Sequence, residues 1–175
     1  QDVPSYDYNP ERSKKLLAEA GDPDGFEIDF LAYRNRDYAE AMMNNLSTVG
    51  IKTNLVYLKY AAFRDKVQEG GSPFNFGTWG SYSINDVSAI TSHFQKGGKD
   101  DYSRDPEVIN QLDIGDTSVD PDKRKAAYKS ALSRIAQQVY MFPLWSYNQN
   151  YAFSKDVDFN PTADEIPRFF TAKWK

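Results

Sequence analysis

The sequence predicts an α/β fold in which a mixed sheet is flanked by helices. In the first half of the chain, stretches with apolar residues at alternate positions are interleaved with stretches whose apolar residues repeat at helical spacing. In the second half, Asp-Pro pairs at residues 105 and 120 mark the starts of helical patterns. The order strand, helix, strand, helix, strand with short connections is typical of a sheet covered by helices.

The first helix is expected to begin at Pro10, because Asn9 can cap it and Gly21 can end it. Its expected buried stripe consists of Leu16, Leu17 and Ala20. The run FEIDFLA, residues 26–32, alternates apolar and polar positions and predicts a strand. Its inward side chains would be Phe26, Ile28 and Phe30. Further along, the patterns predict a helix over 37–49, a strand over 51–58, a short helix over 61–68 and a strand over 74–79.

The second half of the chain is expected to be more helical. A long helix should run from Pro121 to about Gln138. The inner side of this helix is expected to carry Ala126, Ala127, Ala131, Leu132 and Ile135. The runs YMFPLW (140–145) and NYAFS (150–154) predict two strands, the first at an edge because of Pro143. From residue 156 to residue 174 the chain is expected to be extended.

Composition and charge exclude several classes of function. The net charge is −4 and the isoelectric point is about 5.0, so the basic face that nucleic acid requires is not expected. Without cysteine there can be no disulfide, thiolate metal site or cysteine nucleophile. No apolar stretch approaches the ~20 residues of a membrane span. The chain begins with Gln1 and shows no signal peptide, so we expect a processed protein or an excised piece of a longer one.

The sequence carries few residues in a catalytic or metal-binding pattern. The one histidine, His93, has no acidic or histidine partner at a metal-ligand spacing, which indicates a surface or helix-end position. Neither a nucleophile elbow nor a phosphate-binding or dinucleotide-binding glycine loop occurs. A carbohydrate-active hydrolase with paired carboxylates stays open as an alternative, because the separation of such a pair is a spatial fact. A non-catalytic interaction domain is the other alternative, and no metal, cofactor or catalytic residue is expected.

Aromatic and polar residues follow two of the predicted strands. Aromatic residues make up 15% of the chain, twelve of them tyrosines, and Tyr and Trp combine a flat apolar body with a polar tip that suits organic ligands. Ligands of open α/β sheets favour the crevice at the carboxyl ends of the strands. The candidate ligand-binding residues there are Tyr33, Arg34, Trp79, Gly80, Ser81, Tyr82, Ser83, Asn85 and Asp86. Burial of Trp79 in the core is the alternative, since tryptophan is usually well buried.

Four stretches of the chain resemble one protein family. YNPERSKKLLAEAGDPDGFEIDF is similar to the opening of one lobe of the family 5 extracellular solute-binding proteins, the peptide, nickel and opine receptors of ABC importers. AEAMMNNLSTVGIKTNLVYLKYAAFRDKV resembles the helix, Gly-Ile-Lys strand and helix that follow there. FGTWG resembles the family's Gly-Trp strand, and DPDKRKAAYKSALSRIAQQVYMFPLW its helix and Pro-Leu strand. DEIPRFFTAKWK is similar to a natural carboxyl terminus.

The resemblance implies one lobe of a type II, peptide-binding-class periplasmic-binding-protein fold. Residues 1–155 would form an α/β ligand-binding lobe, and residues 156–175 a tail that returns to a missing N-terminal lobe. It further implies a monomeric receptor in the periplasm, or an extracytoplasmic lipoprotein. This receptor would pass a small solute from an interlobe cleft to an ABC permease in the membrane.

One position departs from the family's pattern. Peptide-binding members commonly carry an Asp shortly after the Trp, which pairs with the amino terminus of the peptide. Aligned through Trp79, that position is Tyr82, and the downstream Asp-Pro becomes Asn85-Asp86. A phenol cannot give an ammonium group the charge-assisted hydrogen bond of a carboxylate. The implied solute is therefore a peptide that Asp86 recognises instead, or an opine-like or sugar-derived compound.

Overall fold

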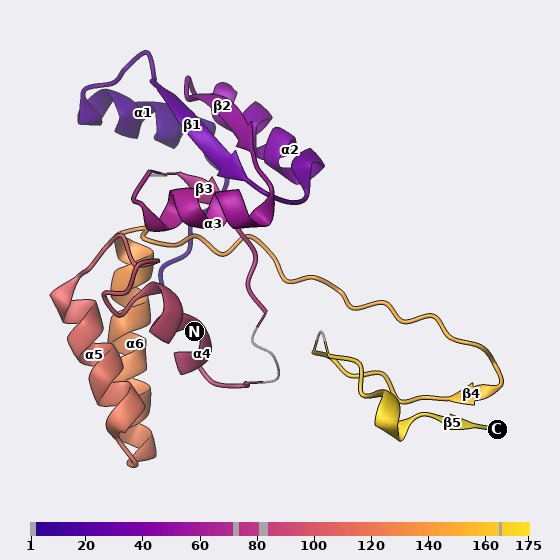
Figure 1. Ribbon diagram of the computed structural model, residues 1–175. Coiled ribbons are helices and arrows are strands. Elements are labelled where there is room, and N and C mark those ends of the chain that lie inside the picture. Colours follow the sequence, from indigo (N-terminus) through magenta and orange to yellow (C-terminus); the bar gives the residue numbers. More distant parts are fainter. Residues whose placement is uncertain (1–2, 72–73, 81–83, 165) are drawn as a thin grey trace. The chain divides into compact units, whose positions relative to one another are not determined.

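The computed structural model describes residues 3–71, 74–80, 84–164 and 166–175 (Figure 1). The chain divides into two compact units. One unit is Ser5–Thr78, and the other comprises Trp79–Lys175 with Gln1–Pro4. Within the described residues, no helix combines the length and the apolar character that crossing a bilayer requires.

The unit Ser5–Thr78 is built on a three-stranded parallel sheet of order β2-β1-β3. The central strand β1 (Glu27–Ala32) pairs with β2 (Lys52–Tyr57) along its whole length, from Glu27 opposite Lys52 to Ala32 opposite Tyr57. The short strand β3 (Asn75–Phe76) joins the other edge, opposite Leu31 and Ala32. The predicted order of strands and helices in this half is confirmed.

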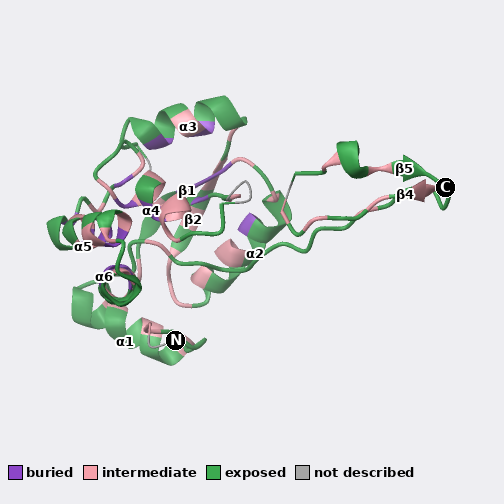
Figure 2. Cartoon of the chain, turned by 90° about the horizontal axis from the view of Figure 1, so that it is seen from below, coloured by how far each residue is buried: buried purple, intermediate pink, exposed green. Residues whose placement is uncertain are grey.

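Helices cover both faces of the central strand. The connections carry α2 (Arg36–Ser47) and α3 (Tyr60–Gln68). Phe30 and Ala32 pack with Ala39 of α2, whereas Leu31, on the opposite face, packs with Phe63 and Val67 of α3. The carboxyl end of β1 is therefore buried on both faces, and the predicted inward alternation holds for Phe30 but not for Phe26, which is 40% exposed. Figure 2 shows buried positions as purple bands on α2 and α3.

The first helix, α1 (Pro10–Ala20), has the predicted ends but not the predicted buried stripe. The Asn9 side chain accepts a hydrogen bond from the Arg12 amide at 2.9 Å, and Gly21 adopts a left-handed φ of 99°. However, no residue of α1 is buried, and Leu16 is 53% exposed. Apolar spacing gives a helix an apolar face, but a neighbouring element must cover that face before it is buried.

The second unit is mainly helical. It contains α4 (Ser88–Phe94), α5 (Pro106–Thr117) and α6 (Pro121–Gln137). The core residues of α5 and α6 are Val108, Leu112, Tyr128, Ala131 and Ile135. Asp105 and Asp120 cap the two long helices as the Asp-Pro pairs predict. The short helix α4 was not expected, because its β-branched residues Ile90 and Thr91 weaken a local helix signal.

The two strands predicted in residues 140–154 do not form. This segment is fully described and has no strand, and Phe142, Leu144 and Trp145 on it are exposed. A strand needs a pairing partner, and none of the described strands pairs with this segment. Farther along, β4 (Val157–Asp158) pairs antiparallel with β5 (Lys173–Trp174), and a short 3-10 helix, η1, spans Phe169–Thr171.

Candidate functional site

Three side chains meet beyond the carboxyl ends of β1 and β3. Tyr33 follows β1 directly, and Thr78 lies two residues after β3. The Tyr33 hydroxyl is 2.8 Å from Thr78 Oγ1, and Arg34 donates from Nη1 to the same oxygen at 3.2 Å. Two of the predicted site residues are therefore brought together at the edge of the sheet where ligands of such folds bind. Thr78 was missed, because a lone threonine at a strand end gives no sequence signal.

The ring of Tyr33 is fixed by aromatic packing. Its centroid is 5.0 Å from that of Tyr60 and 4.8 Å from that of Phe63 in tilted geometry. Both partners lie on α3, and Tyr33 borders the buried cluster of Leu31, Phe63 and Val67. The half-buried ring therefore holds its hydroxyl group in a fixed position at the edge of the sheet.

Arg34 carries a charge that has no acidic partner among the described residues. Its side chain is exposed, and within the described part of the chain its one hydrogen bond is to the Thr78 hydroxyl. Arg36, two residues later, does have an acidic partner, because its Nε pairs with Glu40 Oε1 at 2.7 Å. A guanidinium group has five N–H donors, so Arg34 retains most of its capacity for a carboxylate or phosphate.

Trp79 lies on the end of α4. Its indole stacks on the His93 ring at a centroid distance of 4.6 Å and an interplanar angle of 28°, and meets Phe94 edge-on at 5.3 Å. The side chain remains 39% exposed and belongs to none of the buried clusters. Of the two orientations that the sequence allowed, the structure shows the partly exposed one.

Asp86 is tied to the rest of its unit by two hydrogen bonds. Its Oδ1 accepts from the Ser88 amide at 2.9 Å, and its Oδ2 accepts from Arg124 Nη2 at 2.5 Å. The Ser88 amide has the largest influence on this carboxyl group, and together with Ser88 Oγ and Arg124 it holds the pKa of Asp86 below its usual value. Arg124 also donates to the Gly115 carbonyl at 2.7 Å and lies over the Tyr128 ring. Both oxygens of Asp86 are thus already in use.

The structure describes two of the remaining predicted site residues, Gly80 and Asn85. Gly80 is half-buried and Asn85 is exposed. The predicted contributions of Ser81, Tyr82 and Ser83 lie outside the described residues.

His93 lies in the last turn of α4, and it has an acidic neighbour that the spacing did not reveal. Its Nε2 is 3.1 Å from Asp100 Oδ2. Throughout the described residues, no group of three or more histidines and carboxylates could hold a metal ion.

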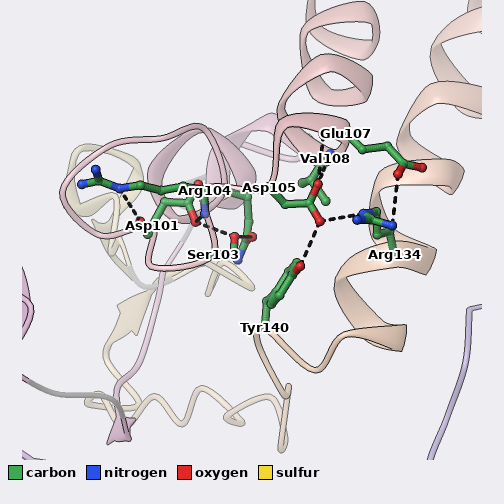
Figure 3. A network of polar contacts seen from close by, with 9 residues as sticks. Asp101, Ser103, Arg104, Asp105, Glu107, Val108, Arg134 and Tyr140 are labelled. Atoms are coloured by element: carbon green, nitrogen blue, oxygen red, sulfur yellow. Dashed lines mark hydrogen bonds and ion pairs between the residues drawn. The ribbon is translucent and has the colours of Figure 1, made fainter.

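The most buried carboxylates of the second unit have structural partners. Asp105 accepts hydrogen bonds from Arg134 Nε at 2.6 Å, from the Tyr140 hydroxyl at 2.9 Å and from the Glu107 amide at 2.9 Å (Figure 3). Asp101 accepts from the Gly97 amide and the Ser103 hydroxyl. Each of these carboxylates therefore fixes the start of a helix or a loop of its own unit.

Comparisons with known proteins identify the family. Residues 1–101 match the bacterial extracellular solute-binding proteins, family 5, in the middle region of that family. The curated heme-binding protein A of Haemophilus influenzae is 38% identical over a 77-residue alignment that covers 39% of this chain and 14% of that protein. The chain therefore covers a small part of this relative.

Solved structures confirm the fold. HbpA2 from Haemophilus parasuis has a TM-score of 0.77 at 24% identity, over 99% of this chain and 37% of that one. A dipeptide-binding protein from Pseudoalteromonas sp. SM9913, solved with Met-Leu, has a TM-score of 0.75 at 23% identity, over 96% and 36% of the two chains. The α/β fold of a type II periplasmic binding protein, predicted from the sequence, is thus confirmed. Since the family match covers more than half of its residues, the chain belongs to the bacterial extracellular solute-binding proteins, family 5.

Proposed function

We propose that this chain is part of the substrate-binding component of an ABC importer. The receptor captures a small polar solute between two lobes and delivers it to a permease in the membrane. The observation that carries the proposal is the cluster of Tyr33, Arg34 and Thr78 beyond the carboxyl ends of two parallel strands. It is the arrangement expected of a binding site rather than of a catalytic one, because it holds donors and a cation but no nucleophile with a base.

The class of solute follows from Arg34. An exposed guanidinium group that lacks an acidic partner in the described residues suits a solute with a carboxylate. Relatives of this chain are named for heme and for a dipeptide, and both of these ligands carry carboxylates. A peptide or an opine-like acid fits this chemistry directly, and a sugar-derived compound fits it where it carries an acid group.

Residues 79–86 are proposed as a second contribution to the ligand cleft. Trp79 would supply a flat apolar surface, and Ser81, Tyr82, Ser83 and Asn85 uncharged donors and acceptors. Asp86 is proposed chiefly to hold this stretch in place through Ser88 and Arg124. A cationic solute would have to compete with Arg124 for the carboxylate, which makes recognition of a peptide amine by Asp86 the less favoured version.

The location and partners of the receptor are proposed from the family. Its members are extracellular solute-binding proteins rather than enzymes. We propose a periplasmic or lipid-anchored monomer made of this chain and an N-terminal lobe. Its transport partner would be an ABC permease in the membrane. Residues 1–155 would belong to the ligand-binding lobe, and 156–175 would return to the other lobe.

The test begins with a thermal-shift screen of peptides, heme and opine acids against the natural receptor that contains this chain. With the solute found, Trp79→Ala and Tyr82→Ala should each weaken binding by about 1–3 kcal/mol, the scale of losing a packed aromatic side chain or leaving a polar group unpaired. Arg34→Ala should weaken binding of acids most, and Arg34→Lys should restore it only in part because the two-pronged geometry is lost.

Arg36→Ala is the matched control, since this neighbouring arginine is already paired with Glu40. If Trp79→Ala, Tyr82→Ala and Arg34→Ala all fold and bind as tightly as the wild type, the proposed site is wrong. A solute with no acid group that binds independently of Arg34 would contradict the proposed solute class alone.

A further inference from the structure

His93, Trp79 and Phe94 form an aromatic group at the end of α4. The His93 and Trp79 rings stack at 4.6 Å with an interplanar angle of 28°. Phe94 meets both rings edge-on, Trp79 at 5.3 Å and His93 at 4.6 Å. These distances lie at the short end of the range in which aromatic pairs attract one another. One face of the indole is therefore covered by a ring of its own unit, while 39% of the side chain stays exposed.

The imidazole that covers the indole is itself held by a carboxylate. His93 Nε2 lies 3.1 Å from Asp100 Oδ2, and the Asp100 side chain is only 7% exposed. The next residue, Asp101, is fully buried and ties down the same loop by accepting hydrogen bonds from the Gly97 amide at 2.8 Å and the Ser103 hydroxyl at 2.6 Å. The chain of contacts thus runs from a fixed loop, through Asp100 and His93, to the indole of Trp79.

We propose that His93 is a positioning residue for Trp79: held by Asp100, its ring covers one face of the indole and leaves the other face to a flat or C–H-rich part of the solute. This inference rests on the proposed function in so far as Trp79 contacts the solute. A histidine suits the position because it combines a flat ring with a polar edge that a carboxylate can hold. An indole that is fixed before binding loses less conformational entropy when the solute arrives.

The experiment uses ¹⁹F NMR of the natural receptor labelled with 5-fluorotryptophan. The Trp79 resonance is the one that disappears in Trp79→Phe. In His93→Ala and in Asp100→Ala this resonance should move toward the position of free 5-fluorotryptophan, because the stacked ring is lost or released, while the other tryptophan resonances stay in place. Asp100→Asn keeps a hydrogen-bond acceptor and should leave the Trp79 resonance near its original position. Lys99→Ala changes an exposed neighbour of Asp100 and serves as the matched control.

The outcomes separate a positioning role from a structural one. If His93→Ala and Asp100→Ala leave the Trp79 resonance unchanged, the proposal is overturned. It is equally overturned if they shift all the tryptophan resonances together with a lower melting temperature, because His93 then supports the fold and not the indole. If Asp100→Asn shifts the Trp79 resonance as far as Asp100→Ala does, a neutral acceptor at this position does not hold the ring, and the hydrogen-bonded hold proposed for Asp100 is overturned.

Acrylamide tests the open face of the indole without any solute. This neutral quencher should reach Trp79 in the wild-type protein, measured as the difference between wild type and Trp79→Phe, and should quench it more strongly in His93→Ala. An indole that acrylamide does not reach would overturn the claim of an open face. Because neither measurement needs the solute, a failure of Trp79→Ala to weaken solute binding would contradict the proposed function and leave the positioning role standing.

Discussion

Asp105 combines three structural tasks in one carboxylate. It caps α5 through the amides of Glu107 and Val108, binds Arg134 and accepts a hydrogen bond from the Tyr140 hydroxyl. Burial by itself would raise the pKa of this group, but the hydrogen bonds from Arg134, Tyr140 and the two amides outweigh it and lower the pKa of Asp105 to about 2. Its ionised form therefore stabilises the folded state.

This pKa predicts the acid sensitivity of the second unit. A carboxyl group whose pKa is lower in the folded state than its ordinary value of about 3.9 contributes stability above that value, and the contribution is lost as the pH falls toward about 2. We expect the urea midpoint of unfolding, followed by helical circular dichroism, to drop between pH 4 and pH 2. In Asp105→Asn the midpoint should be lower at pH 7 and should depend less on pH in this window.

Asp120→Asn is the control for that experiment, because Asp120 caps α6 in the same way but is exposed. Because asparagine caps a helix about as well as aspartate, Asp120→Asn should change the free energy of unfolding little. If Asp105→Asn and Asp120→Asn give the same pH profile, the partners Arg134 and Tyr140 contribute nothing beyond the cap.

Gly25 and Gly21 show how two glycines with positive φ can differ. Both adopt left-handed values, 78° and 99°. A methyl group on Gly25 would lie 2.0 Å from the Gly50 carbonyl oxygen, whereas one on Gly21 would meet nothing within 4 Å. Gly21→Ala should cost about 1 kcal/mol from backbone strain alone, and Gly25→Ala should cost clearly more, because a backbone atom cannot move aside. Equal melting temperatures of the two variants would show that the turn before β1 is free to rearrange.

The sequence predicts contacts between residues that are near one another in the chain. The caps Asn9, Asp105 and Asp120 were foreseen because a cap and its helix are neighbours in the chain. The sequence does not predict the charged partners of Asp105 and Asp86, because these partners are distant in the chain. Arg134 lies 29 residues from Asp105, and Arg124 lies 38 residues from Asp86. The same limit applies to the candidate site, where Tyr33 and Arg34 were identified but Thr78, 45 residues from Tyr33, was not.

Helices and strands differ in how far their own residues determine them. Residues 10–20, 121–137 and 27–32 form the predicted elements, because capping, periodicity and alternation are written within each segment. Residues 140–154 carry strand-forming residues but no strand, because a strand forms only with a pairing partner and no described strand pairs with this segment. The burial of a helix is equally non-local, which is why α1 has the predicted length and an exposed apolar face.

The packing of α5 against α6 gives a prediction at the level of the element. Leu112 is completely buried and packs with Val108, Tyr128, Ala131 and Ile135. Leu112→Ala should therefore destabilise this unit by about 2–5 kcal/mol through lost apolar contact and the cavity left behind. The matched variant is Leu16→Ala on α1, where the side chain is 53% exposed, and it should change stability by no more than about 0.5 kcal/mol.

Denaturant unfolding followed by circular dichroism measures both variants. A cost for Leu16→Ala that approaches the cost for Leu112→Ala would contradict the exposure of α1. It would show that another part of the natural protein covers that helix.

The whole molecule exposes aromatic surface that a complete receptor would be expected to cover. Phe142, Trp145, Phe170 and Trp174 are each between 45% and 86% exposed. Solved relatives are longer, and this chain spans 37% of HbpA2. We expect these side chains to pack against the proposed N-terminal lobe, which also agrees with the proposal that residues 156–175 return to it.

The proposal of two lobes predicts that this chain alone binds its solute weakly. Ligand sites of this kind bury roughly 70–90% of the ligand surface, and one lobe supplies only part of that burial. A nanomolar complex has a binding free energy of about 12 kcal/mol. If one lobe supplies half of it, the dissociation constant rises above about 10 µM. Isothermal titration calorimetry should therefore give tight binding for the natural receptor, weak or undetectable binding for residues 1–175, and a further loss for Arg34→Ala in the receptor. Binding by the chain alone that is as tight as binding by the receptor would contradict the two-lobe proposal, because every essential contact would then lie within these residues.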